Sequence, residues 1–323
     1  MVKNTKGSGM NISKRELLRA LGVIMSAAPA TLLFAKEASN TKGNFAYIYS
    51  DPAIREEFKS FLVNVFHLYP EDDLHALILK AVKQALTDGE VYRQVQKQLG
   101  DIKPFLGDLT YSLPALSKQK RVLTEQTAAL LDPDKRYEGY LELGSNGRFL
   151  DSLEERLHIK GDCFTMAERA PTKSVIDIID RGQIRTAGTF ISLNDYRPAL
   201  AKHISPRSLD LVTVYIGFHH CPVDLREEFL GSIREVLRPG GILIVRDHNV
   251  HNEKMLRLVA LAHDVFNMGT QETWKYNEAE RRNFYSLDKL DSMLTSAGFK
   301  PHGRRLLQKG DPTLNTLLRY TRA

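Results

Sequence analysis

Cysteine is scarce in this 323-residue chain, which contains only Cys163 and Cys221. Two cysteines exclude a disulfide framework and a zinc site with four cysteine ligands, and they leave the redox compartment open. Internal repeats are absent as well, which excludes a solenoid or another repeat architecture. With 42% hydrophobic and 26% charged residues, the composition is that of an ordinary globular protein, long enough for one large core or two domains.

Excess positive charge is missing from most of the chain. The formal net charge is +6, but residues 1–43 contain seven lysines or arginines and two glutamates. That segment therefore carries +5, which leaves about +1 for residues 44–323. Because a nearly neutral body has no basic surface of the kind that binds nucleic acid, we expect no nucleic-acid partner.

A long membrane-spanning run is also absent. Residues 11–19 form a basic stretch, residues 20–35 an apolar one that is short for a membrane span and contains Pro29, and residues 36–43 a small polar exit. Residues 13–19 resemble a twin-arginine export signal with lysine in place of the first arginine. We therefore predict that residues 1–43 are a signal-like or tether segment, through which any membrane association would occur. A plain amphipathic helix is the alternative.

A helical pattern follows the N-terminal segment. Apolar residues recur at three- and four-residue steps from about Asp51 to Leu131, which predicts a smaller all-helical domain over residues 44–136. Residues 132–136, which contain a proline between two aspartates, are the predicted linker. This domain carries no functional motif, and we interpret His67 and His75 as ordinary surface or core residues.

Strands and helices alternate after residue 136, which indicates an α/β fold with a parallel sheet covered by helices on both faces. Two segments near the C-terminus, residues 304–308 and 316–321, predict an antiparallel hairpin. The earlier strands are predicted at residues 140–143, 163–167, 189–193, 209–218 and 242–245, and the helices at residues 148–157, 174–180, 224–237, 255–266 and 287–297.

Polar residues stand where each predicted strand ends. In an open parallel sheet the ligand binds beyond the carboxyl ends of the strands, so this edge is the expected site. The first strand runs into a turn bounded by Gly144 and Gly147, and such a turn lets backbone amides approach a ligand at a helix N-terminus. The other strand ends carry Glu168, then Asn194 and Asp195, then His219 and His220, then Asp247 and His248.

Three segments between Tyr137 and Ala323 carry a resemblance to a known family. Glu142 precedes Gly144 by two residues, residues 208–220 form an Asp-Leu-Val strand that ends in two histidines, and residues 233–245 form a helix, an Arg-Pro-Gly-Gly turn and a strand. These features are similar to motifs of the class I S-adenosylmethionine-dependent methyltransferases. The resemblance implies a Rossmann-like seven-stranded sheet with a reversed C-terminal hairpin over residues 137–323. The glycine turn departs from the family's Gly-x-Gly-x-Gly, because it is shorter and has Asn146 near the second glycine.

The resemblance also implies S-adenosyl-L-methionine as the cofactor. Glu142 would accept a hydrogen bond from the methionine ammonium, and the turn would pass close to the sugar and the sulfonium. Glu168 would accept from both ribose hydroxyls, with Asp162 as the second choice, and Asp195 would accept from the adenine amine. The predicted cofactor-binding residues are Glu142, Gly144, Asn146, Gly147, Glu168, Asp195 and Tyr215.

Methyl transfer needs alignment of the acceptor and, for some acceptors, removal of a proton. The candidates for the base or orienting group are His219, His220, Asp247 and His248, with His263 and Asp264 further along the chain. A divalent metal bound by His219, Asp247, His248 and His263 is an alternative, but the irregular histidine spacing favours a leading hypothesis without metal. In another interpretation, most of these histidines only hydrogen-bond the loop backbone.

The acceptor is predicted to be a small molecule, with a protein or peptide second. Family members that methylate nucleic-acid bases often carry an Asn/Asp-Pro-Pro-Tyr/Phe segment after the fourth strand, and residues 218–222 replace it here with Phe-His-His-Cys-Pro. Four aromatic residues between the last two helices would form either an apolar wall or interdomain core: Trp274, Tyr276, Phe284 and Tyr285.

Two other functions compete with methyl transfer. One is a binding or scaffold protein that keeps the fold without catalysis, which the irregular glycine turn motivates. The other is a nicotinamide dehydrogenase, which Glu142 and the terminal hairpin disfavour. Location is a separate conflict, because the cofactor supply favours the cytoplasm whereas residues 1–43 suggest export or tethering.

Overall fold

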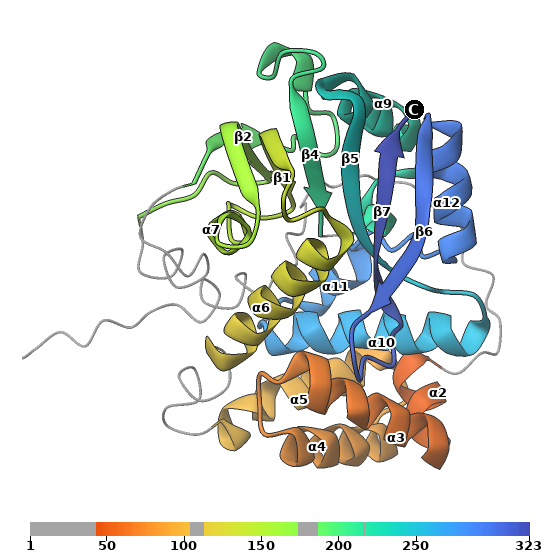
Figure 1. Cartoon of the computed structure of the whole chain (residues 1–323). Coiled ribbons are helices and arrows are strands. Elements are labelled where there is room, and N and C mark those ends of the chain that lie inside the picture. Colours follow the sequence, from red (N-terminus) through yellow and green to blue (C-terminus); the bar gives the residue numbers. More distant parts are fainter. Residues whose placement is uncertain (1–42, 104–112, 174–186, 216) are drawn as a thin grey trace, which may run out of the picture.

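The computed structural model describes residues 43–103, 113–173, 187–215 and 217–323 (Figure 1). The predicted signal-like segment, apart from Gly43, and the helix predicted at residues 174–180 lie outside these residues. Within them, no helix is both long and apolar enough to cross a membrane.

A seven-stranded sheet forms the centre of the C-terminal part of the chain, with the order β3-β2-β1-β4-β5-β7-β6. The pairs β1–β2, β1–β4, β2–β3 and β4–β5 are parallel, whereas β7 is antiparallel to both β5 and β6. The predicted Rossmann-like sheet with a reversed C-terminal hairpin is therefore confirmed. The strands are β1 (Arg136–Leu143), β2 (His158–Ala167), β3 (Thr189–Ser192), β4 (Leu209–Val214), β5 (Leu237–His248), β6 (Phe299–Leu307) and β7 (Asn315–Arg322).

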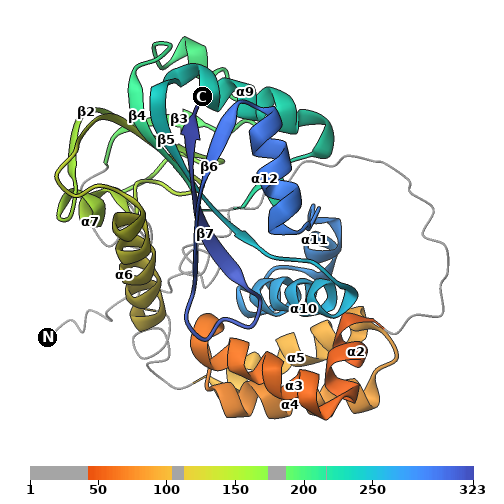
Figure 2. The same ribbon diagram turned by 45° about the vertical axis from the view of Figure 1, so that its right-hand side comes forward.

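Helices cover both faces of this sheet, because successive side chains of a strand point to opposite faces. In β5, Ile242 and Ile244 pack with the core under α6 (Leu113–Leu130) and α7 (Leu150–Glu154). Leu243 and Val245 pack with the core under α9 (Arg226–Val236) and α12 (Leu287–Ser296) on the other face. Figure 2 shows α6 and α9 on opposite sides of the strands.

The N-terminal helices form a separate layer below the sheet (Figure 1). They share one apolar core with α10 (Glu253–Gly269), whose residues Leu258, Leu261 and Val265 are fully buried. This helical region was predicted, and the packing of α10 against it brings a helix from the C-terminal part into the same layer. Its elements are α2 (Asn44–Ser50), α3 (Pro52–Phe61), the π-helical turn η2 (Leu62–Phe66), α4 (Glu71–Gln84), α5 (Asp88–Ile102) and, beside α10, α11 (Trp274–Ala279).

Two predicted elements end earlier than expected. The apolar run predicted as a strand over residues 209–218 leaves the sheet after Val214, because Gly217 has φ +75° and the chain then turns into the short 3-10 helix η5 (Phe218–His220). The helix predicted over residues 148–157 is only the short α7. The other 3-10 turns are η4 (Leu200–Lys202) and η6 (Val223–Leu225).

Candidate active site

A cavity of about 110 Å³ lies where β4 and β5 end, under the N-terminal helices. Tyr215 and Gly217, which follow β4, and Asn315, which begins β7, line the cavity together with polar side chains near the ends of β4 and β5. On the other side, α10 contributes Ala262, His263 and Phe266. The cavity therefore joins the predicted edge of the sheet to the helical layer. The remaining lining residues are Phe61, Val65, Phe66, Ala115, Gln119, His219, His220, Arg246, Asp247 and His248.

His219 and Asp247 form a buried pair at this cavity. His219 Nδ1 lies 2.6 Å from Asp247 Oδ1, and the two side chains are 4% and 2% exposed. Asp247 also accepts hydrogen bonds from the backbone N–H groups of Phe218 and His248 and from the Tyr285 hydroxyl, at 2.9, 2.8 and 2.6 Å. Burial raises the pKa of Asp247, but its other partners are all donors, so we assign the acceptor role to the Asp247 carboxyl and the proton to Nδ1 of His219.

Glycine is required at position 217 for this pair to form. A Cβ at Gly217 would come within 2.6 Å of the His219 ring and within 3.1 Å of Asp247 Oδ1, and its φ of +75° disfavours other residues. Burial lowers the pKa of His219 well below its usual value, because the charged imidazolium would lose its hydration. His219 is therefore neutral near pH 7.

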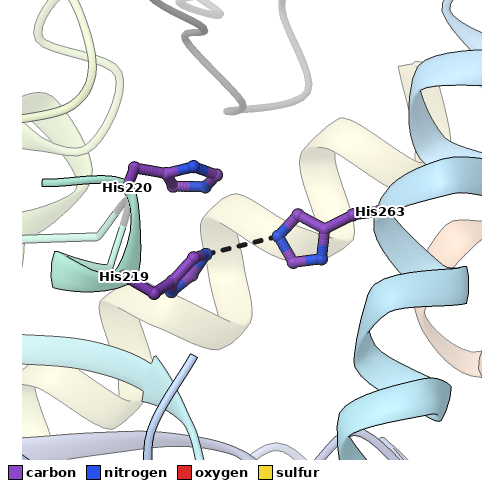
Figure 3. A group of neighbouring side chains, drawn as sticks. All are labelled: His219, His220 and His263. Carbon is purple, nitrogen blue, oxygen red and sulfur yellow. Dashed lines mark hydrogen bonds between the residues drawn. The ribbon is translucent and has the colours of Figure 1, made fainter. Parts of the chain in front are cut away.

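Three more imidazoles surround His219, and each one directs Nδ1 at an oxygen acceptor. His263 Nδ1 lies 3.0 Å from the Val259 carbonyl, His220 Nδ1 lies 3.1 Å from the Arg281 carbonyl, and His248 Nδ1 lies 3.2 Å from the Thr313 carbonyl. Figure 3 shows the rings of His219 and His220 facing that of His263, which comes from α10. All four candidate catalytic residues, together with His263, thus lie at one cavity, although their roles stay predictions.

Glu142 has a different position from these residues. It is fully buried at the end of β1, and its carboxyl group accepts hydrogen bonds from the Phe149 backbone N–H at 3.2 Å, the Tyr140 hydroxyl at 3.2 Å and the Ser145 hydroxyl. Burial raises the pKa of Glu142 to about 7. In the structure this side chain holds the glycine turn closed, and its contact with a ligand ammonium stays a prediction.

The glycines of the turn have conformations that fit this closed shape. Gly144 and Gly147 have φ values of +90° and +81°. A Cβ at Gly147 would lie 3.0 Å from the Cβ of Ala187 and 3.2 Å from the Cγ2 of Thr165, so packing against these neighbours is sufficient to require glycine there.

Glu168 and Asp195 follow β2 and β3 and lie close together. The Asp195 backbone N–H donates to the Glu168 carboxylate, and burial, followed by the charge of Asp195, raises the pKa of Glu168. Asp195 is paired with Arg281 Nη1 at 2.8 Å. Asp162, the alternative to Glu168, is exposed on β2 before the strand reaches this edge.

Several buried side-chain atoms have no hydrogen-bond partner within the described residues, and two of these are oxygens next to the glycine turn and the end of β2. They are Oε1 of Glu168 and Oδ1 of Asn146. Because buried polar atoms are almost always hydrogen-bonded, such atoms indicate a missing donor. A ligand with hydroxyl groups would supply donors at this position.

Tyr215, Arg281 and Tyr285 complete the site. Tyr215 lines the cavity, while its hydroxyl pairs with Thr127 of α6 at 2.8 Å and its ring packs on Phe149 at 4.5 Å between centroids. Arg281, the partner of Asp195, was not predicted as a site residue, and Tyr285 was predicted only as part of an apolar wall or of interdomain core. No local pattern marks either residue, because both reach the sheet edge from the loop before α12.

Comparisons with known proteins find similar folds only. No protein-family model and no curated protein sequence matches the chain. Among solved structures, the CurJ carbon methyltransferase has a TM-score of 0.46 and 16% identity, over 84% of this chain and 71% of the other. The pyocyanin biosynthetic protein PhzM has a TM-score of 0.45 and 13% identity, over 84% and 74% of the two chains.

A third solved structure is the 1,6-didemethyltoxoflavin-N1-methyltransferase of Burkholderia thailandensis, with S-adenosylhomocysteine bound. Its TM-score is 0.40 and its identity 13%, over 72% of this chain and 87% of the other. With TM-scores below 0.5, these similarities decide neither the activity nor the ligand of this chain.

Proposed function

We propose that this protein is an S-adenosylmethionine-dependent methyltransferase that acts on a small molecule. The observation that carries the proposal is that two buried oxygens at the carboxyl ends of β2 and β1 have no hydrogen-bond partner among the described residues: Glu168 Oε1 and Asn146 Oδ1. A carboxylate with a free oxygen at this edge is suited to accept from the two hydroxyls of a ribose. The motifs around Glu142 and residues 233–245 support the same class.

The residues present fit this cofactor in outline. Glu168 and Asn146 would hold the sugar, Asp195 would face the adenine, and Gly144 and Gly147 would bring the main chain close to it. When bound, S-adenosylmethionine supplies a methyl group on a positively charged sulfur, which is a good leaving group. The protein must then hold the acceptor in line with that methyl and exclude water.

The cavity at the ends of β4 and β5 is the proposed acceptor site. Its volume of about 110 Å³ is comparable with that of an engineered cavity of about 150 Å³ that binds benzene in another protein, so it suits a small ring rather than a protein segment. Apolar walls come from Phe61, Phe66 and Phe266, and the polar end is the histidine cluster. This arrangement of apolar walls with few polar groups is typical of small-molecule sites.

His219 is the proposed base of the reaction. Its Nδ1 proton is held by Asp247, so Nε2 carries the lone pair and can accept a proton from the acceptor. The low pKa of His219 keeps Nε2 unprotonated at neutral pH, and Asp247 would stabilise the imidazolium that forms. Tyr285 positions Asp247 through its 2.6 Å hydrogen bond.

The test is methyl transfer from a labelled donor to mixtures of small hydroxyl, amine and carbon acids. We expect one equivalent of S-adenosylhomocysteine for each labelled product, with no label on added protein or nucleic acid. Label only on protein would contradict the small-molecule acceptor. Cofactor binding without turnover across broad mixtures would favour the alternative of a non-catalytic binding or scaffold protein.

In the same proposal, residues 1–43 determine where the protein acts. Export of the folded protein or a tether that faces the cytoplasm would reconcile a signal-like segment with a cytoplasmic cofactor. Fractionation of cells that express the tagged chain with and without residues 1–40 tests this. Identical distributions of the two forms would contradict a targeting role.

A further inference from the structure

Two ring nitrogens face each other at hydrogen-bond distance at the edge of the cavity. Nε2 of His219 lies 3.3 Å from Nε2 of His263 (Figure 3). The Nδ1 atoms of both rings point at acceptors, the Asp247 carboxylate and the Val259 carbonyl, so each ring carries its proton on Nδ1. Two lone pairs therefore meet at hydrogen-bond distance, and this contact is repulsive unless a positive group joins them.

His220 adds a third nitrogen to this pair. Its Nδ1 is directed at the Arg281 carbonyl at 3.1 Å, with Glu280 Oε1 at 3.5 Å, so its other ring nitrogen is the one available to a ligand. One ring nitrogen from each of His219, His220 and His263 lies within 4.8 Å of the other two. The three side chains come from η5 and α10, so the approach is made by two packed elements and not by a single flexible loop.

We propose that His219, His220 and His263 bind a divalent transition-metal ion of the Zn²⁺ type. Zinc–imidazole bonds of about 2.0 to 2.1 Å at a tetrahedral angle place two ligand nitrogens about 3.3 to 3.4 Å apart. The two Nε2 atoms are separated by 3.3 Å, which is this spacing. His220 would complete the site by a small rotation of its partly accessible ring, whose side chain is 11% exposed.

The surroundings of these ligands fit a metal site of this kind. A ligating histidine almost always donates its other N–H to a carboxylate or a carbonyl, which fixes its tautomer. All three histidines have such a partner: Asp247 for His219, the Arg281 carbonyl for His220 and the Val259 carbonyl for His263. Imidazole nitrogens as ligands select zinc, copper, iron or nickel over Mg²⁺ and Ca²⁺, which prefer oxygen ligands.

The fourth position of the ion would open into the cavity, which all three ligands line. A water molecule or an acceptor hydroxyl bound there would lose its proton to solvent more readily. In the metal-bound protein His219 would therefore act as a ligand, and the ion would take over the task proposed for its Nε2. The metal site itself does not depend on methyl transfer, so it is tested without cofactor or acceptor.

Calorimetric titration of the tag-free, chelator-treated full chain with Zn²⁺ tests the site, with Mg²⁺ in parallel. We expect one equivalent of Zn²⁺ to bind and no saturation with Mg²⁺. His220→Ala and His263→Ala should remove tight binding, whereas His302→Ala, which alters an exposed residue of β6, should leave it unchanged. Asp247→Asn, which changes only a partner of a ligand, should weaken Zn²⁺ binding about 10- to 100-fold.

Co²⁺ gives a second readout on the unaltered protein, independent of whether the variants fold. Its visible absorption should show a four-coordinate site with nitrogen ligands at one equivalent. Absence of stoichiometric Zn²⁺ binding to the unaltered protein would overturn the proposal. So would Zn²⁺ binding of unchanged affinity in folded His220→Ala and His263→Ala, or equal binding of Mg²⁺.

Discussion

The two halves of the sheet edge differ in chemistry, although they belong to one continuous row of strand ends. The half at β1, β2 and β3 carries carboxylates, and Glu168 Oε1 and Asn146 Oδ1 have no hydrogen-bond partner among the residues that the structure describes. The half at β4 and β5 carries histidines around a cavity that helices cover. The first half is suited to hydroxyl and amine donors, and the second to a proton or a metal ion. This difference indicates that cofactor binding and acceptor activation can be lost separately.

His219→Ala should have the largest effect, which is a loss of turnover. It should leave the half of the edge at β1, β2 and β3 unchanged. Loss of a positioned base lowers the rate by about 10² to 10⁴, so we expect kcat to fall by that factor. The affinity for S-adenosylmethionine should change less than about threefold, which is under 1 kcal/mol. Turnover with the identified acceptor and calorimetric Kd values measure the two effects. A loss of cofactor affinity as large as the loss of rate would show that the halves are not separate.

Glu142→Gln, a change in the half of the edge at β1, β2 and β3, should alter how the free energy of unfolding depends on pH. The pKa of Glu142 is raised from 4.5 to about 7, so the folded protein keeps a proton that the unfolded chain releases earlier. This contribution to stability is present below about pH 4.5 and is lost as the pH rises through 7. Between these pH values, the free energy of unfolding of the unaltered protein should therefore fall by about 3 kcal/mol relative to that of Glu142→Gln.

Urea unfolding at pH 4.5, 5.5, 7 and 8 measures this difference, at pH values chosen to span the shift. Glu227→Gln, an exposed change on α9, is the matched control and should follow the unaltered protein. A constant difference between Glu142→Gln and the unaltered protein at all four pH values would contradict a raised pKa at Glu142.

Glu168→Ala should weaken cofactor binding without affecting the histidine half. Hydrogen bonds to a charged group contribute about 1.5 to 3 kcal/mol, so the Kd for S-adenosylmethionine should rise by about tenfold to a hundredfold. Asp162→Ala, on the exposed part of β2, is the control and should bind normally. If Asp162→Ala weakened binding and Glu168→Ala did not, the assignment of the ribose acceptor would be reversed.

Tyr285→Phe should have the smallest effect of these changes. It removes one of the hydrogen bonds to Asp247, and the N–H donors of Phe218, His219 and His248 remain. We expect a loss of about 1.5 kcal/mol, or roughly tenfold in kcat, with KM unchanged. A rise in KM with constant kcat would instead place Tyr285 in contact with the acceptor.

The two halves also differ in how far the sequence predicted them. Glu142, Gly144 and Gly147 form one contiguous motif, and Glu168 and Asp195 follow apolar strands, so local patterns were sufficient to locate the edge. The alternation of strands and helices predicted the parallel sheet and the antiparallel hairpin, whereas the seven-stranded arrangement with its reversed last strand was implied by the family resemblance. The role of Glu142 in closing its own turn depends on Tyr140, Ser145 and Phe149, and the sequence does not show which of these groups reaches it.

The histidine cavity could be predicted only in part. His219, His220, Asp247 and His248 stand at strand ends and were candidates, but the cavity closes only when α10 brings His263 to His219. Arg281 and Tyr285 belong to a loop that returns to the edge, so tertiary packing alone determines their contacts. Because the histidines are irregularly spaced along the chain, their spacing does not indicate that their ring nitrogens converge in the fold.

Calorimetric titration with S-adenosylmethionine, S-adenosylhomocysteine and NADH tests the central claim most directly, because all three ligands contain an adenine nucleoside. The proposed function predicts saturable binding of the first two at one site per chain and no saturation with NADH. Absence of binding heat with both sulfur compounds, or saturation with NADH alone, would contradict it.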